Sequence, residues 1–255
     1  MLDGHKIYNN DCHLLYDSEI LDESLLEASG AALLDTNFLQ QVAFSQRITS
    51  GGRGQAWFVE IGGYSAVYRQ YRRGGLVAFI IKQLYFGLNE ENARSFKEWR
   101  LLHWMMSKNL PVPQPIAASV CRWPFKMSPF YRAKILVKRI PNALTLDQIL
   151  SLRELSDAGW YRVGKIIRLF HKSGVFHADL NANNILLDNQ LHVYLIDFDK
   201  GQLRDAEQSK QQWMQDNLNR FKRSLLKLQR VHKYYYFTEE NWQMLISGYN
   251  IPETN

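Results

Sequence analysis

Residues 177–199, which read HADLNANNILLDNQLHVYLIDFD, restrict the fold of this chain more than any other stretch. They form two apolar segments joined by a tight turn, and they place Asp179, Asn184 and Asp197 beside those segments. Carboxylate and amide oxygens are hard ligands that suit Mg²⁺, and phosphoryl transfer needs a carboxylate that orients the acceptor hydroxyl. The stretch therefore predicts a loop and strand pair that gathers hydroxyl-binding and metal-binding groups.

The spacing of these residues resembles the catalytic loop and metal-binding Asp of the protein-kinase-like fold, H-x-D-x-x-x-x-N followed by D-F-G. Two positions differ from that pattern, because Ala178 stands where Arg is usual and Asp199 stands where Gly is usual. The Arg of regulated protein kinases commonly contacts an activation-loop phosphate, so its absence argues against that form of regulation. The alternative interpretation is an ordinary loop with Asx turns that leads into a strand.

The length of 255 residues and the hydrophobic content of 46% allow one two-lobed domain or two small domains. The longest apolar run, LVAFII at 76–81, is far shorter than the ~20 residues that cross a bilayer. The first residues, MLDGHKIYNND, lack the basic region and apolar core of a secretory signal. We therefore expect a cytoplasmic chain with no signal peptide and no transmembrane segment.

The two cysteines, Cys12 and Cys121, lie far apart in the sequence and show no metal-ligand spacing. A cytoplasmic protein of this size does not need a disulfide for stability. We therefore expect both cysteines to be unpaired packing residues.

The pattern of apolar residues changes along the chain from strand-like to helical. Three antiparallel strands are predicted within 41–86, in the segments VAFSQRI, QAWFVEI and YSAVYRQYR, because glycine-containing turns separate them. Further predicted elements are a short helix near 18–29, an amphipathic helix at 89–108, and a strand pair, or the second strand of one, at 130–140. Helices are predicted at 144–151, 157–174 and about 206–233. The sequence thus predicts an α+β fold with a sheet-rich N-lobe at 1–140, which holds one main helix, and a mostly helical C-lobe at 141–255. The active site is expected in the cleft.

A glycine-rich turn precedes the second predicted strand and comprises Ser50, Gly51, Gly52, Arg53 and Gly54. Glycine lets a backbone approach phosphate oxygens closely and direct N–H groups at them. A hairpin turn without any ligand has the same composition, so the motif is weak by itself. Its position ahead of the catalytic-loop motif favours a phosphate-binding loop.

The kinase pattern also requires a cation on the third strand to hold the α- and β-phosphates of the nucleotide. No Lys occupies that strand, and Arg69 is the candidate because a guanidinium can bind phosphate bidentately. Glu98 lies in the middle of the predicted helix at 89–108 and is the predicted partner that orients Arg69. The alternative for Glu98 is a solvated helix acid near Arg94 or Arg100.

The segments HADLNANNILL, VYLIDFDKG, YRQYRRGG and NLPVPQPIAA together resemble the bacterial lipopolysaccharide-core kinases. The resemblance implies that ATP phosphorylates the 4-hydroxyl of a 3-deoxy-D-manno-octulosonic acid (Kdo) sugar on a lipid A precursor, at the cytoplasmic face of the inner membrane. It implies that Asp179 accepts or orients the hydroxyl proton and that Asn184 and Asp197 hold Mg²⁺. It also implies that Arg69 and the Ser50–Gly54 backbone bind the triphosphate.

The predicted helix near 206–233 concentrates positive charge in a chain with 31 Lys and Arg against 25 Asp and Glu, a net charge of +6. Its cations, with Lys233, are Lys210, Arg220, Lys222, Arg223, Lys227 and Arg230, set around Trp213, Met214, Leu218, Phe221, Leu225 and Leu228. One interpretation is an interfacial helix that binds an anionic membrane peripherally. The other is a C-lobe helix whose apolar side is core and whose basic side is solvated.

Several related functions would use the same residues. Another sugar or small-molecule kinase, such as a heptose kinase or an antibiotic phosphotransferase, would share the site, and a pseudokinase would bind nucleotide without turnover. No protein or nucleic-acid partner is expected, because the sequence lacks an A-P-E segment and any base-stacking motif. His177 is expected to support the catalytic loop rather than act as a base. Asp199 is expected either to add a ligand or to pair with Lys200.

Overall fold

The computed structural model describes residues 5–9, 12–21, 46–48, 55–61, 63–71, 85–86, 89–123, 128–204 and 212–251. The fold is α+β, and the chain divides into two compact units. Unit 1 comprises Met1–Trp104 and Pro113–Arg139, and unit 2 comprises Met105–Val112 and Ile140–Asn255. The predicted glycine-rich turn at 50–54 and most of the predicted helix at 18–29 lie outside the described residues.

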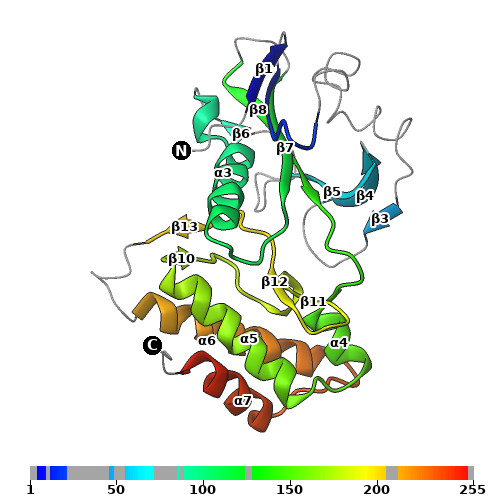
Figure 1. The fold of residues 1–255 in the computed structure, drawn as a ribbon, viewed down its shortest axis with the longest axis vertical. Helices are drawn as coiled ribbons and strands as arrows, with labels where there is room; N and C mark the ends of the chain where they lie inside the picture. The colour runs from blue at the N-terminus through cyan, green and yellow to red at the C-terminus, as the bar shows by residue number, and fades with distance from the viewer. Residues whose placement is uncertain are drawn as a thin grey trace. The chain divides into compact units, whose positions relative to one another are not determined.

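Unit 1 is built on an antiparallel sheet with the strand order β1-β2-β7-β8-β5-β4-β3, and β6 pairs with β8 (Figure 1). The strands are β1 (His5–Asn9), β2 (Cys12–Tyr16), β3 (Gln46–Ile48), β4 (Gln55–Ile61), β5 (Tyr64–Gln70), β6 (Tyr85–Phe86), β7 (Pro115–Arg122) and β8 (Phe130–Lys138). The predicted strands that correspond to β3, β4, β5 and β8 are confirmed. The sequence did not predict β1 and β2.

Alternation along the strands explains how one face of the sheet forms a core cluster. In β5, Ala66, Tyr68 and Gln70 are buried, whereas Val67 and Arg69 between them are only partly buried. The core cluster contains Leu14 and Tyr16 of β2, Val59 and Ile61 of β4, Ala66 and Tyr68 of β5, Ile116 and Ala117 of β7, Leu136 of β8, and Leu21. Arg69 therefore lies on the sheet face opposite Tyr68.

The main helix of unit 1 is α3 (Arg94–Ser107), which confirms the amphipathic helix predicted at 89–108. Its apolar side is buried through Phe96, Trp99 and Leu102. The helix ends where Asn109 adopts a left-handed backbone conformation with φ 56°, and the Leu110 amide donates to the Met105 carbonyl at 3.0 Å. This is a Schellman-type end, and the prolines beyond it prevent continuation of the helix.

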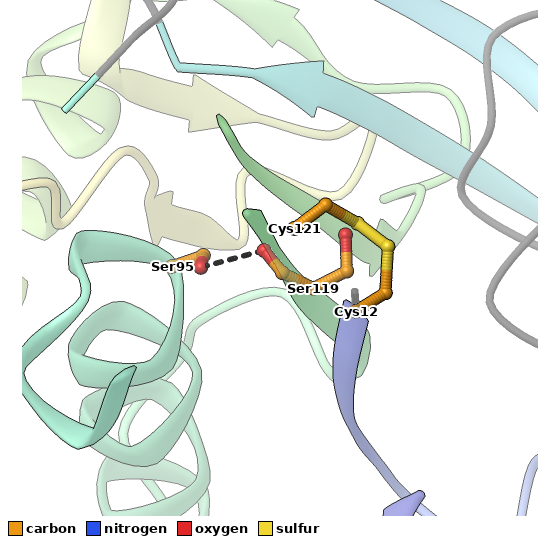
Figure 2. Close-up of a disulfide and its surroundings, with 4 residues drawn as sticks. All are labelled: Cys12, Ser95, Ser119 and Cys121. Carbon is orange, nitrogen blue, oxygen red and sulfur yellow. Dashed lines mark hydrogen bonds between the residues drawn. A yellow bond between two sulfur atoms is a disulfide. The ribbon is translucent and has the colours of Figure 1, made fainter. Parts of the chain in front are cut away.

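The cysteines form a disulfide, so the prediction that they are unpaired was wrong. Cys12 of β2 lies directly opposite Cys121 of β7 in the antiparallel register, and their Cα atoms are 4.0 Å apart. Figure 2 shows the bond beside Ser119, whose carbonyl accepts a hydrogen bond from Ser95 Oγ of α3 at 3.0 Å. Separation in sequence was a poor guide, because a strand pairing between distant segments brings the two sulfurs together. The disulfide ties the β1–β2 hairpin to the rest of the sheet.

Unit 2 is mostly helical (Figure 1). Its elements are β9 (Leu144–Thr145), α4 (Leu146–Leu152), α5 (Asp157–Lys172), β10 (Val175–Phe176), the 3₁₀-helix η4 (Ala182–Asn184), β11 (Ile185–Leu187), β12 (Val193–Leu195), β13 (Gln202–Leu203), α6 (Gln212–Val231) and α7 (Glu239–Tyr249). Side-chain caps start three of the helices: Thr145 for α4, Ser156 for α5 and Thr238 for α7. The sequence did not predict α7.

Helices α5 and α7 cross so closely that each contributes a glycine to the contact. A Cβ added to Gly164 would lie 1.9 Å from the Leu245 carbonyl oxygen, and one added to Gly248 would lie 2.0 Å from that of Tyr161. Real Cβ atoms do not approach backbone so closely, so both positions require glycine.

Helix α6 buries its apolar side. Trp213, Leu218, Phe221 and Leu225 are buried, whereas Arg220, Arg223, Lys227 and Arg230 are exposed. The interpretation in which the apolar side of α6 is core is therefore correct. In the part of the chain that the structure describes, no helix combines the length and apolarity needed to cross a membrane.

We expect reduction of the disulfide to destabilise unit 1. The bond closes a span of 109 residues, and removal of such a constraint on the unfolded chain costs about 2–5 kcal/mol of unfolding free energy. The measurement is urea unfolding with and without dithiothreitol, together with hydrogen exchange of the β2 and β7 amides. A Cys12→Ser variant serves as the control, because reductant should leave its unfolding midpoint unchanged. Equal midpoints for oxidised and reduced wild-type protein would contradict the expectation.

Candidate active site

The loop that carries Asp179 is held by the buried ring of His177. Asp179 donates its backbone N–H to His177 Nδ1 at 3.2 Å, and His177 Nε2 lies 2.9 Å from the carbonyl oxygen of Ile196. Since Nδ1 accepts, Nε2 must carry the proton that binds Ile196, so the ring is neutral in this arrangement. Burial lowers the pKa of His177, partly offset by the hydrogen bond to Ile196. These contacts agree with the supporting role predicted for His177.

The same network places Asn184 and Asp197 near the Asp179 backbone. Asn184 is buried and donates its side-chain N–H to the Asp179 carbonyl at 2.9 Å, so the amide oxygen is the atom that it would offer to a cation. The Ile196 amide donates to the Asn184 carbonyl at 3.0 Å, which extends the β11–β12 pairing and brings Asp197 alongside. Asp197 has a φ of 63°, a left-handed conformation that is costly for a residue with a Cβ.

The segment after Asp197 is anchored by an aromatic side chain. Phe198 is buried, its ring stacks on Phe170 of α5 with centroids 5.7 Å apart, and it lies 4.7 Å from the His177 ring. The Gly201 amide donates to the Phe198 carbonyl at 2.7 Å and closes a turn that contains Asp199 and Lys200. The role of Asp199 stays a prediction.

Helix α6 supports the catalytic loop through three polar residues on one face. Asn217 Nδ2 donates to the His177 carbonyl at 2.8 Å, Arg220 Nη1 lies 3.2 Å from Asp179 Oδ1, and Ser224 Oγ accepts from the Ala182 amide at 3.4 Å. Spacings of three and four residues put these side chains in one row along a helix. The row therefore contacts the loop at its start, at Asp179 and at η4.

A second histidine connects three helices behind this row. His171 of α5 is buried, and its ring nitrogens lie 2.8 Å from Tyr249 Oη of α7 and 3.3 Å from Asn217 Oδ1 of α6. Burial lowers the pKa of His171 to about 4, against a raising contribution from the Asn217 hydrogen bond. His171 is therefore neutral near pH 7, and it belongs to the core.

Unit 1 contains the predicted pairing of Arg69 with Glu98. Arg69 of β5 forms an ion pair with Glu98 of α3, and Tyr71 Oη donates to the other carboxylate oxygen. The Glu98 side chain is only 1% exposed and that of Arg69 is 23% exposed, so the solvated alternative for Glu98 is wrong. Loss of one partner of such a buried pair costs about 3–5 kcal/mol. The carboxylate thus fixes the direction of a guanidinium that still reaches solvent.

The side-chain oxygens of Asn184 and Asp197 are of the chemical kind that binds Mg²⁺ together with nucleotide phosphates. Mg²⁺ at such sites usually takes one or two carboxylates together with phosphate oxygens and water. Within the described ranges, no group of three or more His, Cys, Asp or Glu side chains is arranged to hold a metal ion by itself. The exposed carboxylate of Asp179 can meet an acceptor hydroxyl.

Several residues that contact the predicted residues within each unit were not predicted from the sequence. Asn217 could have been noticed, because it is a polar residue on the otherwise apolar side of α6. Tyr71 could also have been noticed, because it lies two residues after Arg69 and so on the same strand face. The contacts of Arg220 and Ser224 with the loop carry no local sequence signal. They depend on how α6 packs.

Comparisons with known proteins identify close relatives. The model of the lipopolysaccharide kinase (Kdo/WaaP) family matches residues 44–249. A protein of Photobacterium profundum named 3-deoxy-D-manno-octulosonic acid kinase is 36% identical over 243 residues, which cover 94% of this chain and 98% of the relative. Proteins of the same name from Xylella fastidiosa (strain 9a5c) and Actinobacillus succinogenes are each 40% identical, over 78% and 79% of this chain and 81% and 83% of those relatives.

We expect the protein to lose stability in mild acid because His171 is neutral in the fold. Its folded pKa of about 4 lies below the ordinary value of 6.5, so its contribution is complete above pH 6.5 and is lost as the pH falls toward 4. Between pH 7.5 and 5 the loss is about 2 kcal/mol. Urea unfolding at the two pH values measures it.

A His171→Gln variant is the control for this effect. It lacks the titrating ring and keeps a side chain that can hydrogen-bond, so its stability should depend less on pH even if its stability at pH 7.5 is lower. An unchanged pH dependence in the variant would show that another group is responsible.

Proposed function

The chain belongs to the lipopolysaccharide kinase (Kdo/WaaP) family, and from this premise we propose that it transfers the γ-phosphoryl group of ATP to the 4-hydroxyl of a Kdo sugar in lipopolysaccharide inner-core synthesis. The Photobacterium profundum relative, which covers 94% of the chain, carries the name of that kinase. The observation that carries the chemistry is the hydrogen-bonded loop that sets Asp179 beside Asn184 and leads to Asp197.

Asp179 is the proposed proton acceptor. The sugar hydroxyl oxygen forms a bond to the γ-phosphorus as the bond from that phosphorus to the β-bridging oxygen breaks, so ADP leaves and the hydroxyl proton passes to the carboxylate. The 65% exposure of the Asp179 side chain supports this role, because an acceptor can reach it. The bonds from Asn184 and His177 to the Asp179 backbone keep the carboxylate in place.

Asn184 and Asp197 are the proposed Mg²⁺ ligands. When bound, Mg²⁺ neutralises charge on the β- and γ-phosphate oxygens. The left-handed backbone at Asp197 supports this role, since costly conformations persist where a side chain must point in a fixed direction.

Arg69 is the proposed phosphate-binding cation, held in direction by Glu98. Arg binds phosphate through two parallel N–H bonds, so a fixed guanidinium plane favours this use. The backbone of Ser50–Gly54 is proposed to bind the nucleotide phosphates together with Arg69. This part of the proposal rests on the sequence.

We propose that unit 1 and unit 2 are the two lobes of a protein-kinase-like fold. The order of elements supports this, because an antiparallel sheet with one long helix is followed by a helical unit that contains the catalytic loop.

The acceptor is proposed to be lipid-linked, and the protein is proposed to bind the cytoplasmic face of the inner membrane through a C-terminal basic patch. This patch comprises Lys227, Arg230, Val231, Lys233 and Tyr234, all of them exposed. The apolar side of α6 is core, so α6 itself does not lie in the bilayer. Large exposed side chains at Val231 and Tyr234 beside three cations instead favour contact with anionic lipid headgroups.

Phosphate transfer from ATP to Kdo-lipid IVA by the purified protein tests the proposed function. We expect wild-type protein to transfer phosphate and an Asp179→Ala variant to lose about 10²–10⁴-fold in kcat, because the proton acceptor is gone. An Asp216→Asn variant, which changes an exposed acid on α6, should retain wild-type activity. Full activity of Asp179→Ala would refute the role of Asp179, and ATP binding without transfer by wild-type protein would indicate a pseudokinase.

Co-sedimentation with vesicles tests the C-terminal basic patch. We expect stronger binding to phosphatidylglycerol-containing vesicles than to phosphatidylcholine vesicles, and about 25-fold weaker binding after Lys227→Gln with Arg230→Gln, since each cation contributes about 1 kcal/mol. A Lys97→Gln, Lys108→Gln variant loses the same charge elsewhere and should bind normally. Equal binding of the wild-type protein to both vesicles would refute the patch.

A further inference from the structure

Arg220 stands next to the carboxylate that the proposed function assigns to the acceptor hydroxyl. Its Nη1 lies 3.2 Å from Asp179 Oδ1, and the two side chains are 50% and 65% exposed. An ion pair this exposed contributes little to stability, because water screens it. Its position beside Asp179 therefore calls for a functional explanation.

Helix α6 fixes where Arg220 can reach. Asn217, one turn before, is buried and bound to the His177 carbonyl, and Ser224, one turn after, accepts from the Ala182 amide. These two anchors hold the Arg220 backbone against the loop, while the long side chain can still move in solvent. The guanidinium can thus move away from Asp179 Oδ1 while the α6 backbone stays in place.

The bond to Arg220 engages Asp179 Oδ1, one of the two carboxylate oxygens that could accept the hydroxyl proton in the proposed reaction. The acceptor named for the relatives is a sugar acid, so it brings a carboxylate of its own together with hydroxyl groups. Arg binds carboxylates most strongly through two parallel N–H bonds, whereas Arg220 makes a single hydrogen bond to Asp179. An incoming sugar acid can therefore exchange partners with this ion pair.

We propose that Arg220 binds the carboxylate of the acceptor sugar and, by leaving Asp179 to do so, frees Asp179 Oδ1 for the acceptor hydroxyl. The proposal rests on the proposed function. It makes Arg220 a specificity-determining residue, because a neutral sugar would lack the group that draws Arg220 away. Recognition of the acceptor then has two points, a hydroxyl at Asp179 and a carboxylate at Arg220.

The test compares Kdo-lipid IVA with the same acceptor after methyl esterification of its Kdo carboxyl group. For wild-type protein we expect esterification to raise the KM of the acceptor about 10- to 100-fold, the usual effect of a lost charge-assisted hydrogen bond. Arg220→Gln should raise the KM for the acid by a similar factor and should no longer distinguish acid from ester. The KM for ATP should stay within about twofold in both proteins, as for groups that do not contact the nucleotide.

Two further variants separate this role from a structural one. Arg220→Lys keeps the charge and loses the planar fork, so it should recover part of the discrimination between acid and ester. Lys165→Gln, which removes an exposed cation of α5, should discriminate as wild-type protein does.

The possible results are distinct. If Arg220→Gln still prefers the acid as strongly as wild-type protein does, the proposal is wrong. If it lowers kcat equally for both acceptors without a change in KM, Arg220 only positions Asp179, and the proposal is again wrong. If wild-type protein transfers phosphate to neither acceptor, the proposed function fails first.

Discussion

The neutral ring of His177 is the contact on which the geometry of the candidate active site depends. It accepts a hydrogen bond from the Asp179 amide on one side and binds the Ile196 carbonyl on the other, so one ring joins the loop to the strand that leads to Asp197. A protonated ring could not accept from Asp179, and burial disfavours that form. Asn217 then ties the His177 backbone to α6, and His171 ties Asn217 to α5 and α7. Helices α5, α6 and α7 thus set the position of the short loop that carries His177 and Asp179.

Local motifs predicted which residues of the loop lie together, because these residues are close in sequence. Asp179 and Asn184 are five residues apart, and the hydrogen bond between them lies within one loop. The Arg69–Glu98 pair was predicted from strand and helix placement, and it is confirmed as an ion pair. The contacts of Asn217, Arg220 and Ser224 with the loop were missed, because they depend on how α6 packs against the loop. A polar residue among apolar ones marks Asn217, but nothing local marks Arg220.

Elements with a strong apolar periodicity were predicted from the sequence. Elements whose strand partners lie far away in the sequence were missed. Alternation identified β4 and β5, and helical spacing identified α3 and α5. The β1–β2 hairpin was missed, and β2 pairs with β7 across most of unit 1. The same distance made the cysteines look unrelated, although the register puts Cys12 opposite Cys121. The glycines of the α5–α7 crossing are likewise explained only by a partner helix.

The pairing of β2 with β7 has a consequence for the order in which the chain is made. Cys12 leaves the ribosome 109 residues before Cys121, a delay of roughly 5–20 s at ordinary rates of synthesis. A two-stranded hairpin is marginally stable by itself, and an open strand edge can pair with other chains. The newly made hairpin must therefore wait for its neighbour. Chaperone binding to the nascent protein, and its aggregation, should respond most to sequence changes in the segment between β2 and β7.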